Sequence, residues 1–307
     1  MKDNFISIAD LSADEIHETL DLAAEIKAKL KAGEDYKPLR GKTMAMIFAK
    51  PSARTRISFE TGIKKLGGYA LYLSPNDISM GKREAVKDIA RVISRFNEAI
   101  MARLFSHQHM LELAEYASIP VINGLTDYNH PCQVMGDIFT VKEHRGNLDD
   151  LKIVFVGDGN NVVNSWLNLA AKLPMHFVLT GPEGYDPDEN TLTNAKDSGI
   201  SNIEIIHDPV EALKNADVVY TDVWASMGQE DEAAKRAEEF KDYQLNTELM
   251  SHSKPSTLVM HCLPAHRGDE ITDEVIDGEN SIVFDQAENR MHVQNAIMVQ
   301  LMSGQSD

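Results

Sequence analysis

The chain of 307 residues is long enough for about two domains, and its 43% hydrophobic and 7% aromatic residues are typical of a packed globular protein. Its 30 basic and 48 acidic residues give a formal charge of −18, which repels nucleic acid and anionic lipid. These values argue against disorder and against nucleic-acid or membrane partners, so we expect any basic cluster to bind a small anion.

The N-terminal stretch MKDNFISIADLSADEI has no apolar signal core, and no run approaches the roughly 18 apolar residues that span a bilayer. We therefore expect a soluble, cytoplasmic protein. The two cysteines, Cys132 and Cys262, lie in short polar motifs and predict no disulfide scaffold.

Strands and helices alternate through the first half of the chain. A capping box of Ser12 and Glu15 predicts a first helix that ends near Gly33. This alternation favours a parallel sheet covered by helices on both faces. The strands are expected at 43–49, 69–73, 99–104 and 120–125, and the helices between them include 52–66 and 84–96.

The polar stretch EHRGNLDDL, at about 143–151, predicts a boundary, because LKIVFVGDGNN restarts the same alternation. We predict two doubly wound parallel-sheet α/β domains, 1–147 and 148–287. A final helix is expected at about 286–303, and residues 288–307 are expected to pack back on the first domain. The strands of the second domain are expected at 151–156, 176–180, 203–207, 217–223, 257–260 and 281–284.

The unusual polar motifs follow predicted strands, and ligands of open α/β sheets bind beyond the carboxyl ends of strands. In KPSARTR, residues 50–56, Ser52 is a natural N-cap, so free backbone N–H groups and the positive helix end can hold a phosphate. Arg54 can add a bidentate guanidinium and Thr55 a hydroxyl. A solvated, charged helix start is the alternative interpretation. Arg56 cannot share a face with Arg54, and we assign it to structure or a subunit contact.

Two further motifs follow the later strands of this half. Arg103 ends a buried strand and is either a second phosphate ligand or part of an ordinary ion pair. In HPCQ, His130 and Gln133 lie three residues apart on one side of a helix start, so they can converge on one small ligand. A capping histidine is the alternative for His130.

The second half has three such motifs. VGDGNNVVNSW lacks the third glycine of a dinucleotide fingerprint, because Val162 stands there, and Asn160 and Asn161 suit a carboxylate instead. In DVWASMG, Asp222 can hold an ammonium group. In HCLPAHRG, Cys262 is either a nucleophile or base, or an inert buried cysteine. The histidines around it lack zinc-site spacing, so we expect no metal site.

SARTR, HPCQ, GDGNN, DVWASMG and HCLP, in this order, resemble the aspartate/ornithine carbamoyltransferase family, and the last three resemble its ornithine branch. The resemblance extends from about residue 40 to QAENR at 286–290 and the final helix. It implies an active site in the cleft between two domains and transfer of the carbamoyl group of carbamoyl phosphate to the δ-amine of L-ornithine. The products are L-citrulline and phosphate, as in arginine biosynthesis. It also implies no cofactor and a homotrimer or a multiple of it.

The resemblance assigns roles to individual residues. His130 would donate to the carbamoyl oxygen, and Gln133 and the carbonyls of Cys262 and Leu263 would accept from the carbamoyl NH₂. The implied catalytic residues are Arg54, Arg103, His130 and Cys262. The implied carbamoyl phosphate ligands are Ser52, Ala53, Arg54, Thr55, Ser79, Arg103, His130, Gln133, Cys262, Leu263 and Arg290. The implied ornithine ligands are Asn161, Asp222, Ser226 and Met227.

The sequence departs from the family pattern in two places. Ala53 replaces the first threonine of the usual STRTR, which removes one hydroxyl from the phosphate site. Ser79 stands where ornithine enzymes usually have Gln or His, and Arg83 stands where they usually have Gly. In the family, the loop that contains both positions reaches a neighbouring subunit's site. The alternatives are a carbamoyltransferase for another amine, such as putrescine or aspartate, and a catalytically silent amino-acid-binding homologue.

Overall fold

The computed structural model describes residues 3–78, 80, 84–225 and 232–303. The chain divides into two compact units: unit 1 is Met1–Gly136 with Glu288–Asp307, and unit 2 is Asp137–Ala287. The division falls inside two helices, α6 (Pro131–Arg145) and α13 (Val283–Met302). The domain limits inferred from the sequence, at 147–148 and 287–288, stay a prediction. Within the described ranges, no helix is both long and apolar enough to cross a membrane.

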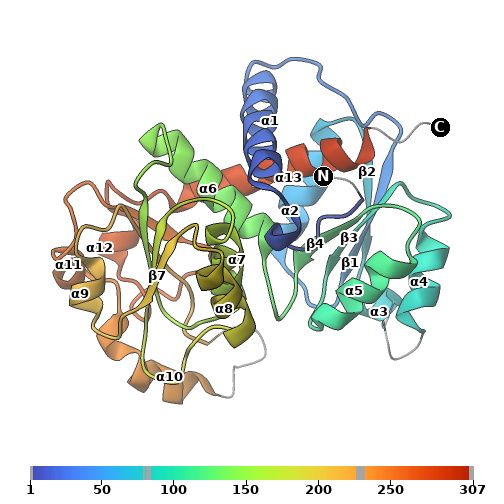
Figure 1. Ribbon diagram of the computed structural model, residues 1–307. Coiled ribbons are helices and arrows are strands. Elements are labelled where there is room, and N and C mark those ends of the chain that lie inside the picture. The colour runs from blue at the N-terminus through green and yellow to red at the C-terminus, as the bar shows by residue number, and fades with distance from the viewer. Residues whose placement is uncertain (1–2, 79, 81–83, 226–231, 304–307) are drawn as a thin grey trace. The chain divides into compact units, whose positions relative to one another are not determined.

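Unit 1 contains a four-stranded parallel sheet in the order β2-β1-β3-β4. Ala45 and Ile47 join one hydrophobic cluster with α4 and α5, and the alternation of side chains along a strand turns Met44 and Met46 to the other face. Figure 1 shows α4 and α5 on one side of this sheet and α2 with α13 on the other. The strands are β1 (Thr43–Phe48), β2 (Tyr69–Leu73), β3 (Ala99–Arg103) and β4 (Val121–Leu125).

The helices of unit 1 begin where the sequence carries caps. Ser12 and Glu15 form the predicted capping box at the start of α1, and Ser106 caps α5. Gly62 of α2 packs so closely on α13 that an added Cβ would lie 2.3 Å from the Asn295 side-chain oxygen. The elements are η1 (Ile8–Asp10), α1 (Ala13–Lys31), α2 (Ala53–Lys65), α3 (Pro75–Ile78), α4 (Val86–Ile93) and α5 (His107–Tyr116).

Unit 2 contains a five-stranded parallel sheet in the order β7-β6-β5-β8-β9. These two parallel sheets, each with helices on both faces, confirm the predicted fold class. The strands are β5 (Lys152–Val156), β6 (His176–Thr180), β7 (Asn202–Ile205), β8 (Val218–Thr221) and β9 (Leu258–His261).

Helices also cover the two faces of the second sheet, with α7 and α8 on one side and α9, α11 and α12 on the other (Figure 1). On the first face, Trp166 of α7 packs on Phe177 and Tyr220, with ring centroids 6.3 and 6.1 Å away. The helices are α7 (Asn161–Ala170), α8 (Glu189–Asp197), α9 (Pro209–Leu213), α10 (Ala233–Glu239), η3 (Lys241–Tyr243), α11 (Thr247–Met250) and α12 (Asp273–Ile276).

One predicted strand, at residues 281–284, is wrong. Ser281 forms a single parallel bridge to Val259, and α13 begins at Val283. Ile282 donates one backbone hydrogen bond to Val259 at 3.0 Å, so the buried Ile282 lies beside β9 without extending the sheet. Short buried apolar runs do not distinguish a strand from a helix start.

The strand order decides where the polar motifs lie. In unit 1 the chain adds β2 on one side of β1 and then crosses to add β3 on the other, so the order reverses between β1 and β3. In unit 2 the same reversal falls between β5 and β8. Ligands of such sheets bind outside the carboxyl ends of the strands at this switch point. In unit 1, SARTR follows β1 and Arg103 is the last residue of β3. In unit 2, GDGNN follows β5 and Asp222 follows β8.

The core of unit 2 gives a matched stability test. Phe177 is fully buried, whereas Phe284 is 64% exposed. Phe177→Ala should lower the free energy of unfolding by about 3–5 kcal/mol, because it leaves a cavity beside Trp166. Phe284→Ala should change it by less than about 1 kcal/mol. Both tryptophans, Trp166 and Trp224, belong to unit 2, so their fluorescence during urea unfolding reports this unit. Equal losses in the two variants would contradict the assigned core.

Candidate active site

The start of α2 gathers the groups that the sequence predicted for a phosphate. Ser52 is the N-cap, and its hydroxyl accepts a hydrogen bond from the Thr55 backbone N–H at 3.4 Å. Phe48, at the end of β1, pairs in register with Arg103 at the end of β3. Arg103 Nη1 donates to Thr55 Oγ1 at 3.4 Å, so the structure brings Arg103 to the α2 start. Arg54 is half-buried in the same first turn, beside the exposed Ala53.

Arg56 is engaged elsewhere. Its Nε donates to Glu60 Oε2 at 2.9 Å, and its guanidinium lies 4.1 Å from the centre of the Tyr72 ring. Both partners lie on α2 and β2, within unit 1. Arg56 therefore stabilises this part of unit 1, which agrees with the structural role predicted for it.

His130 and Gln133 meet Arg290 within unit 1. Gln133 Oε1 accepts a hydrogen bond from Arg290 Nη1 at 2.8 Å. Helices α6 and α13 approach closely at this point: a Cβ added to Gly136 of α6 would lie 3.0 Å from the Cα of Arg290 of α13. The predicted members of HPCQ and the distant Arg290 thus belong to one buried group.

The His130 ring is buried, and its surroundings favour the neutral form. Burial, followed by the positive charges of Arg290 and Arg103, holds the pKa of His130 well below its usual value. A neutral imidazole has one N–H donor and one acceptor nitrogen. His130 can therefore donate a hydrogen bond to a carbonyl oxygen without adding a positive charge to a site that already contains arginines.

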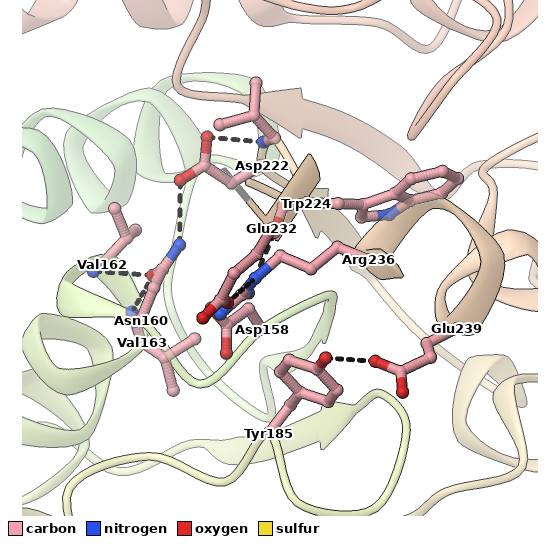
Figure 2. A network of polar contacts seen from close by, with 11 residues as sticks. Asp158, Asn160, Val162, Val163, Tyr185, Asp222, Trp224, Glu232, Arg236 and Glu239 are labelled. Carbon is pink, nitrogen blue, oxygen red and sulfur yellow. Dashed lines mark hydrogen bonds and ion pairs between the residues drawn. The ribbon is translucent and has the colours of Figure 1, made fainter. Parts of the chain in front are cut away.

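The acceptor motifs of unit 2 form a second group, drawn in Figure 2. Asn160 caps α7, since its Oδ1 accepts from the backbone N–H groups of Val162 and Val163 at 2.9 and 3.2 Å. Its Nδ2 donates to Asp222 Oδ2 at 3.0 Å. Asn160 thereby orients the Asp222 carboxylate, while Asn161, the residue predicted to bind a carboxylate, is half-buried at the first position of α7.

Cys262 joins the same group through Asp222. Its Sγ donates to Asp222 Oδ1 at 2.8 Å, and the backbone N–H of Val223 donates to the same oxygen at 2.8 Å. Cys262 is half-buried, whereas Cys132 is fully buried, and burial raises the pKa of the Cys132 thiol to about 12. The role of Cys262 as a nucleophile or base, or as an inert cysteine, stays a prediction.

The HCLP turn is held by His261. Its Nδ1 accepts a hydrogen bond from the Leu263 backbone N–H at 2.9 Å, so its proton is on Nε2, which lies 2.8 Å from Glu270 Oε1. Leu263 has φ of 60° in the left-handed region, and the Leu263–Pro264 peptide is cis. The two hydrogen bonds of His261 hold the backbone that carries the Cys262 and Leu263 carbonyls.

Three of these side chains have donor atoms at metal-ligand spacing. Ligand atoms of Asp222, His261 and Cys262 lie within 4.8 Å of one another, the one such group in the described part of the chain. Both ring nitrogens of His261 are already engaged, by Leu263 and by Glu270, which disfavours metal binding by this side chain. The expectation that the protein has no metal site stays a prediction.

Sequence reasoning missed four residues that organise unit 2. Arg236 and Asp158 form a buried ion pair at 2.7 Å, and Gln286 links the His261 backbone N–H to Asp137. The fourth residue is Glu270, the partner of His261. Asp158 and Gln286 stand in the motifs GDGNN and QAENR, which could have indicated them, but no local pattern marks Arg236 or Glu270.

Some predicted ligands lie outside the described residues. These are Ser79, Ser226 and Met227, together with the neighbouring Arg83. Their roles stay predictions.

Comparisons with known proteins match both units. A family model described as "Aspartate/ornithine carbamoyltransferase, carbamoyl-P binding domain" matches residues 3–143, and one described as "Aspartate/ornithine carbamoyltransferase, Asp/Orn binding domain" matches residues 149–301. A relative named ornithine carbamoyltransferase, chloroplastic, from Pisum sativum is 59% identical over 300 residues, which are 97% of this chain and 80% of that protein.

Further relatives agree. An ornithine carbamoyltransferase of Chlorobaculum tepidum is 53% identical over 98% of this chain and 90% of its own length. The solved structure of the Pyrococcus furiosus ornithine carbamoyltransferase superposes with a TM-score of 0.93 at 47% identity, covering 99% of this chain and 98% of that one. The resemblance predicted from the five motifs is thereby confirmed, and this chain belongs to the aspartate/ornithine carbamoyltransferase family.

Proposed function

We propose that this protein transfers the carbamoyl group of carbamoyl phosphate to the δ-amine of L-ornithine, giving L-citrulline and phosphate. The observation that carries the proposal is the Asp222 group, in which Asn160 and Cys262 fix one carboxylate at the switch point of unit 2. Such a carboxylate suits an amino-acid acceptor, and the relatives compared above are all named for ornithine.

The phosphate of the donor would bind at the start of α2. Backbone N–H groups at a helix start carry partial positive charge, and the Ser52 cap uses only some of them. The guanidinium groups of Arg54 and Arg103 would add charge-assisted hydrogen bonds. Ala53 offers no hydroxyl, so its contribution is limited to its backbone.

The carbamoyl group would be oriented by His130 and Gln133. As the amine attacks the carbamoyl carbon, negative charge grows on the carbamoyl oxygen, and the neutral His130 can stabilise it by donating a hydrogen bond. Gln133 Oε1, fixed by Arg290, and the carbonyls of Cys262 and Leu263 would accept from the carbamoyl NH₂.

On the acceptor side, Asn161 would bind the ornithine carboxylate, and Asp222 would bind an ammonium group. The δ-amine must lose a proton before it attacks, and with a lysine-like pKa only roughly one molecule in 2,500 is neutral at pH 7. Cys262 and Asp222 would position this amine, and the Asp222 carboxylate would receive its proton. A new C–N bond forms and the C–O bond to phosphate breaks. The attacking nitrogen loses its second proton to the departing phosphate, which leaves as hydrogen phosphate.

We infer that the reaction serves arginine synthesis, since a relative that is 50% identical is named as the anabolic enzyme of Pyrococcus furiosus. The cytoplasmic location expected from the sequence stays a prediction, and one relative is named chloroplastic.

We further propose self-association as a homotrimer or a multiple of it. Ile57 of α2 and Tyr69 and Leu71 of β2 are exposed apolar side chains, and β2 is an edge strand of the first sheet. An exposed apolar edge strand favours a partner that covers it. A composite site completed by the loop around Ser79 would depend on this assembly.

The proposed activity and its phosphate site are tested together. Phosphate release from carbamoyl phosphate and formation of the carbamoylated product should be detected with ornithine, and not with putrescine or aspartate as acceptor. Arg54→Ala should lower kcat/KM for carbamoyl phosphate about tenfold to a hundredfold, because a charged hydrogen bond contributes about 1.5–3 kcal/mol. The exposed Arg40, changed to Ala, is the control. Unchanged kinetics in a folded Arg54→Ala protein would remove Arg54 from the site.

The buried His130 predicts a pH dependence of stability. Its pKa in the folded protein is lowered from 6.5, so the unfolded chain binds this proton first as pH falls. The stability is therefore complete above about pH 6.5 and is lost as pH falls from there toward the lowered pKa. Thermal unfolding midpoints between pH 7.5 and 5.5 should fall more steeply for the unmodified protein than for His130→Gln.

Other groups act in the same direction, because burial also lowers the pKa values of His107 and His292. The difference between the unmodified protein and His130→Gln isolates His130. Removal of the exposed His252 by His252→Gln controls for the loss of one imidazole. Parallel curves for the unmodified protein and His130→Gln would contradict a neutral, buried His130.

The exposed edge predicts a change in assembly. Leu71→Asp should lower the molar mass measured by light scattering, because a charge replaces an apolar side chain that a second copy would cover. The matched control is Ile200→Asp, an exposed isoleucine of unit 2. A monomeric unmodified protein, or an unchanged mass for Leu71→Asp, would refute this proposal.

A further inference from the structure

Arg236 is a buried arginine that no step of the proposed reaction uses. It lies on α10 and is only 5% exposed. Figure 2 shows its guanidinium among three polar partners. Nη1 donates to Asp158 Oδ2 at 2.7 Å and to the Trp224 carbonyl at 3.0 Å, and Nε donates to Glu232 Oε2 at 3.1 Å.

The Tyr185 ring completes the surroundings of this arginine. The guanidinium carbon lies 4.9 Å from the ring centre, and the Tyr185 hydroxyl donates to Glu239 of the same helix α10. The planar guanidinium group of an arginine can stack on an aromatic ring and hydrogen-bond a carboxylate at the same time, whereas the ammonium group of a lysine is not planar.

Two of these partners belong to the segments that carry the acceptor group. Asp158 lies two residues before Asn160, in the turn that follows β5. Trp224 lies two residues after Asp222, in the segment that follows β8. The guanidinium therefore joins the same two segments that the hydrogen bond between Asn160 and Asp222 joins. The two connections lie side by side across the switch point of unit 2 (Figure 2).

The turn that contains Asp158 is also held on its other side, by the segment before α8. Gly159 presses on the segment before α8, because an added Cβ would lie 2.3 Å from the Pro187 nitrogen. The Gly159 backbone N–H donates to the Tyr185 carbonyl at 2.8 Å. The pairing of β5 with β8 holds the two segments together at the end of the strands, and Arg236 adds a second connection between them beyond the sheet.

Loss of either charge of the pair would affect the other. Asp158 is only 8% exposed, and an unpaired buried carboxylate is costly. Burial raises the pKa of Asp158, while the hydrogen bond and charge of Arg236 lower it. Asp158 also repels the neighbouring Asp222 carboxylate, so the arginine keeps two buried acids close together.

We propose that Arg236 and Asp158 are positioning residues for the amino-acid acceptor, which they serve by fixing the spacing of Asn160 and Asp222. This inference rests on the proposed function, and it extends the acceptor site to an ion pair that does not touch the substrate. It predicts that damage to the pair weakens ornithine binding selectively, since carbamoyl phosphate is assigned mainly to residues of unit 1.

The test compares Arg236→Met, Arg236→Lys and Asp158→Asn with a control arginine. Arg267→Met is the control, because Arg267 also pairs with two carboxylates in unit 2, Asp273 and Asp277, but is 40% exposed. Arg236→Met should raise KM for ornithine about tenfold or more, while KM for carbamoyl phosphate stays within about twofold. Arg267→Met should leave both constants unchanged.

The conservative and double variants separate positioning from general stability. Arg236→Lys keeps the charge but loses the planar fork, so its KM for ornithine should lie between those of the unmodified protein and Arg236→Met. In the double variant Asp158→Asn with Arg236→Met, the effect should be smaller than the product of the two single effects, because both remove one connection. A purely structural pair would lower the unfolding midpoint without changing the ratio of the two KM values.

Binding without turnover is read by calorimetric titration of L-norvaline, an unreactive ornithine analogue, at saturating carbamoyl phosphate. Weaker norvaline binding by Arg236→Met supports the inference, and equal binding by the two folded proteins overturns it. If Arg236→Met does not fold, unchanged constants for Arg236→Lys and Asp158→Asn overturn it equally. A lack of citrulline formation by the unmodified protein would instead refute the proposed function, and norvaline titration would still test the positioning role.

Discussion

Both units depend on the geometry of a parallel sheet whose strand order reverses once. Parallel strands place all their carboxyl ends at one edge, and a reversal leaves two neighbouring strands whose following loops leave in opposite directions. In unit 1 this places the α2 start beside Arg103, and in unit 2 it places Asn160 beside Asp222. Polar side chains from distant parts of the chain therefore meet without disturbing the apolar faces beneath them.

Buried polar and charged side chains at these edges are held by hydrogen-bonding partners. Arg290 is held by Gln133, Arg236 by Asp158, and His261 by Glu270, each in the buried interior of its own unit. A buried polar or charged group without a partner is costly, so each of these contacts fixes its segments in one arrangement. In a chain with a formal charge of −18, the arginines near His130 form a local positive site that favours an anion, and burial together with these charges keeps the imidazole neutral.

Most of the secondary structure could be predicted from the sequence because the signals are local. The strands of the first sheet, the capping box at Ser12 and the N-cap at Ser52 agree with the structure within one or two residues. The strand expected at 281–284 is wrong because a short run with two buried apolar residues, Ile282 and Val283, suits either a strand or the start of a helix. Only the contacts of Ser281 and Ile282 with Val259 decided between them.

The sequence by itself determined the motifs, their order and the local structure around each, because caps, turns and strand periodicity act over a few residues. Only the tertiary structure decided which motifs meet. Gln133 and Arg290 are 157 residues apart, and Asp158 and Arg236 are 78 residues apart. No local pattern encodes such a pair, since it forms only when strand order and helix packing bring the two segments together. The role inferred for Arg236 could therefore come only from the folded chain.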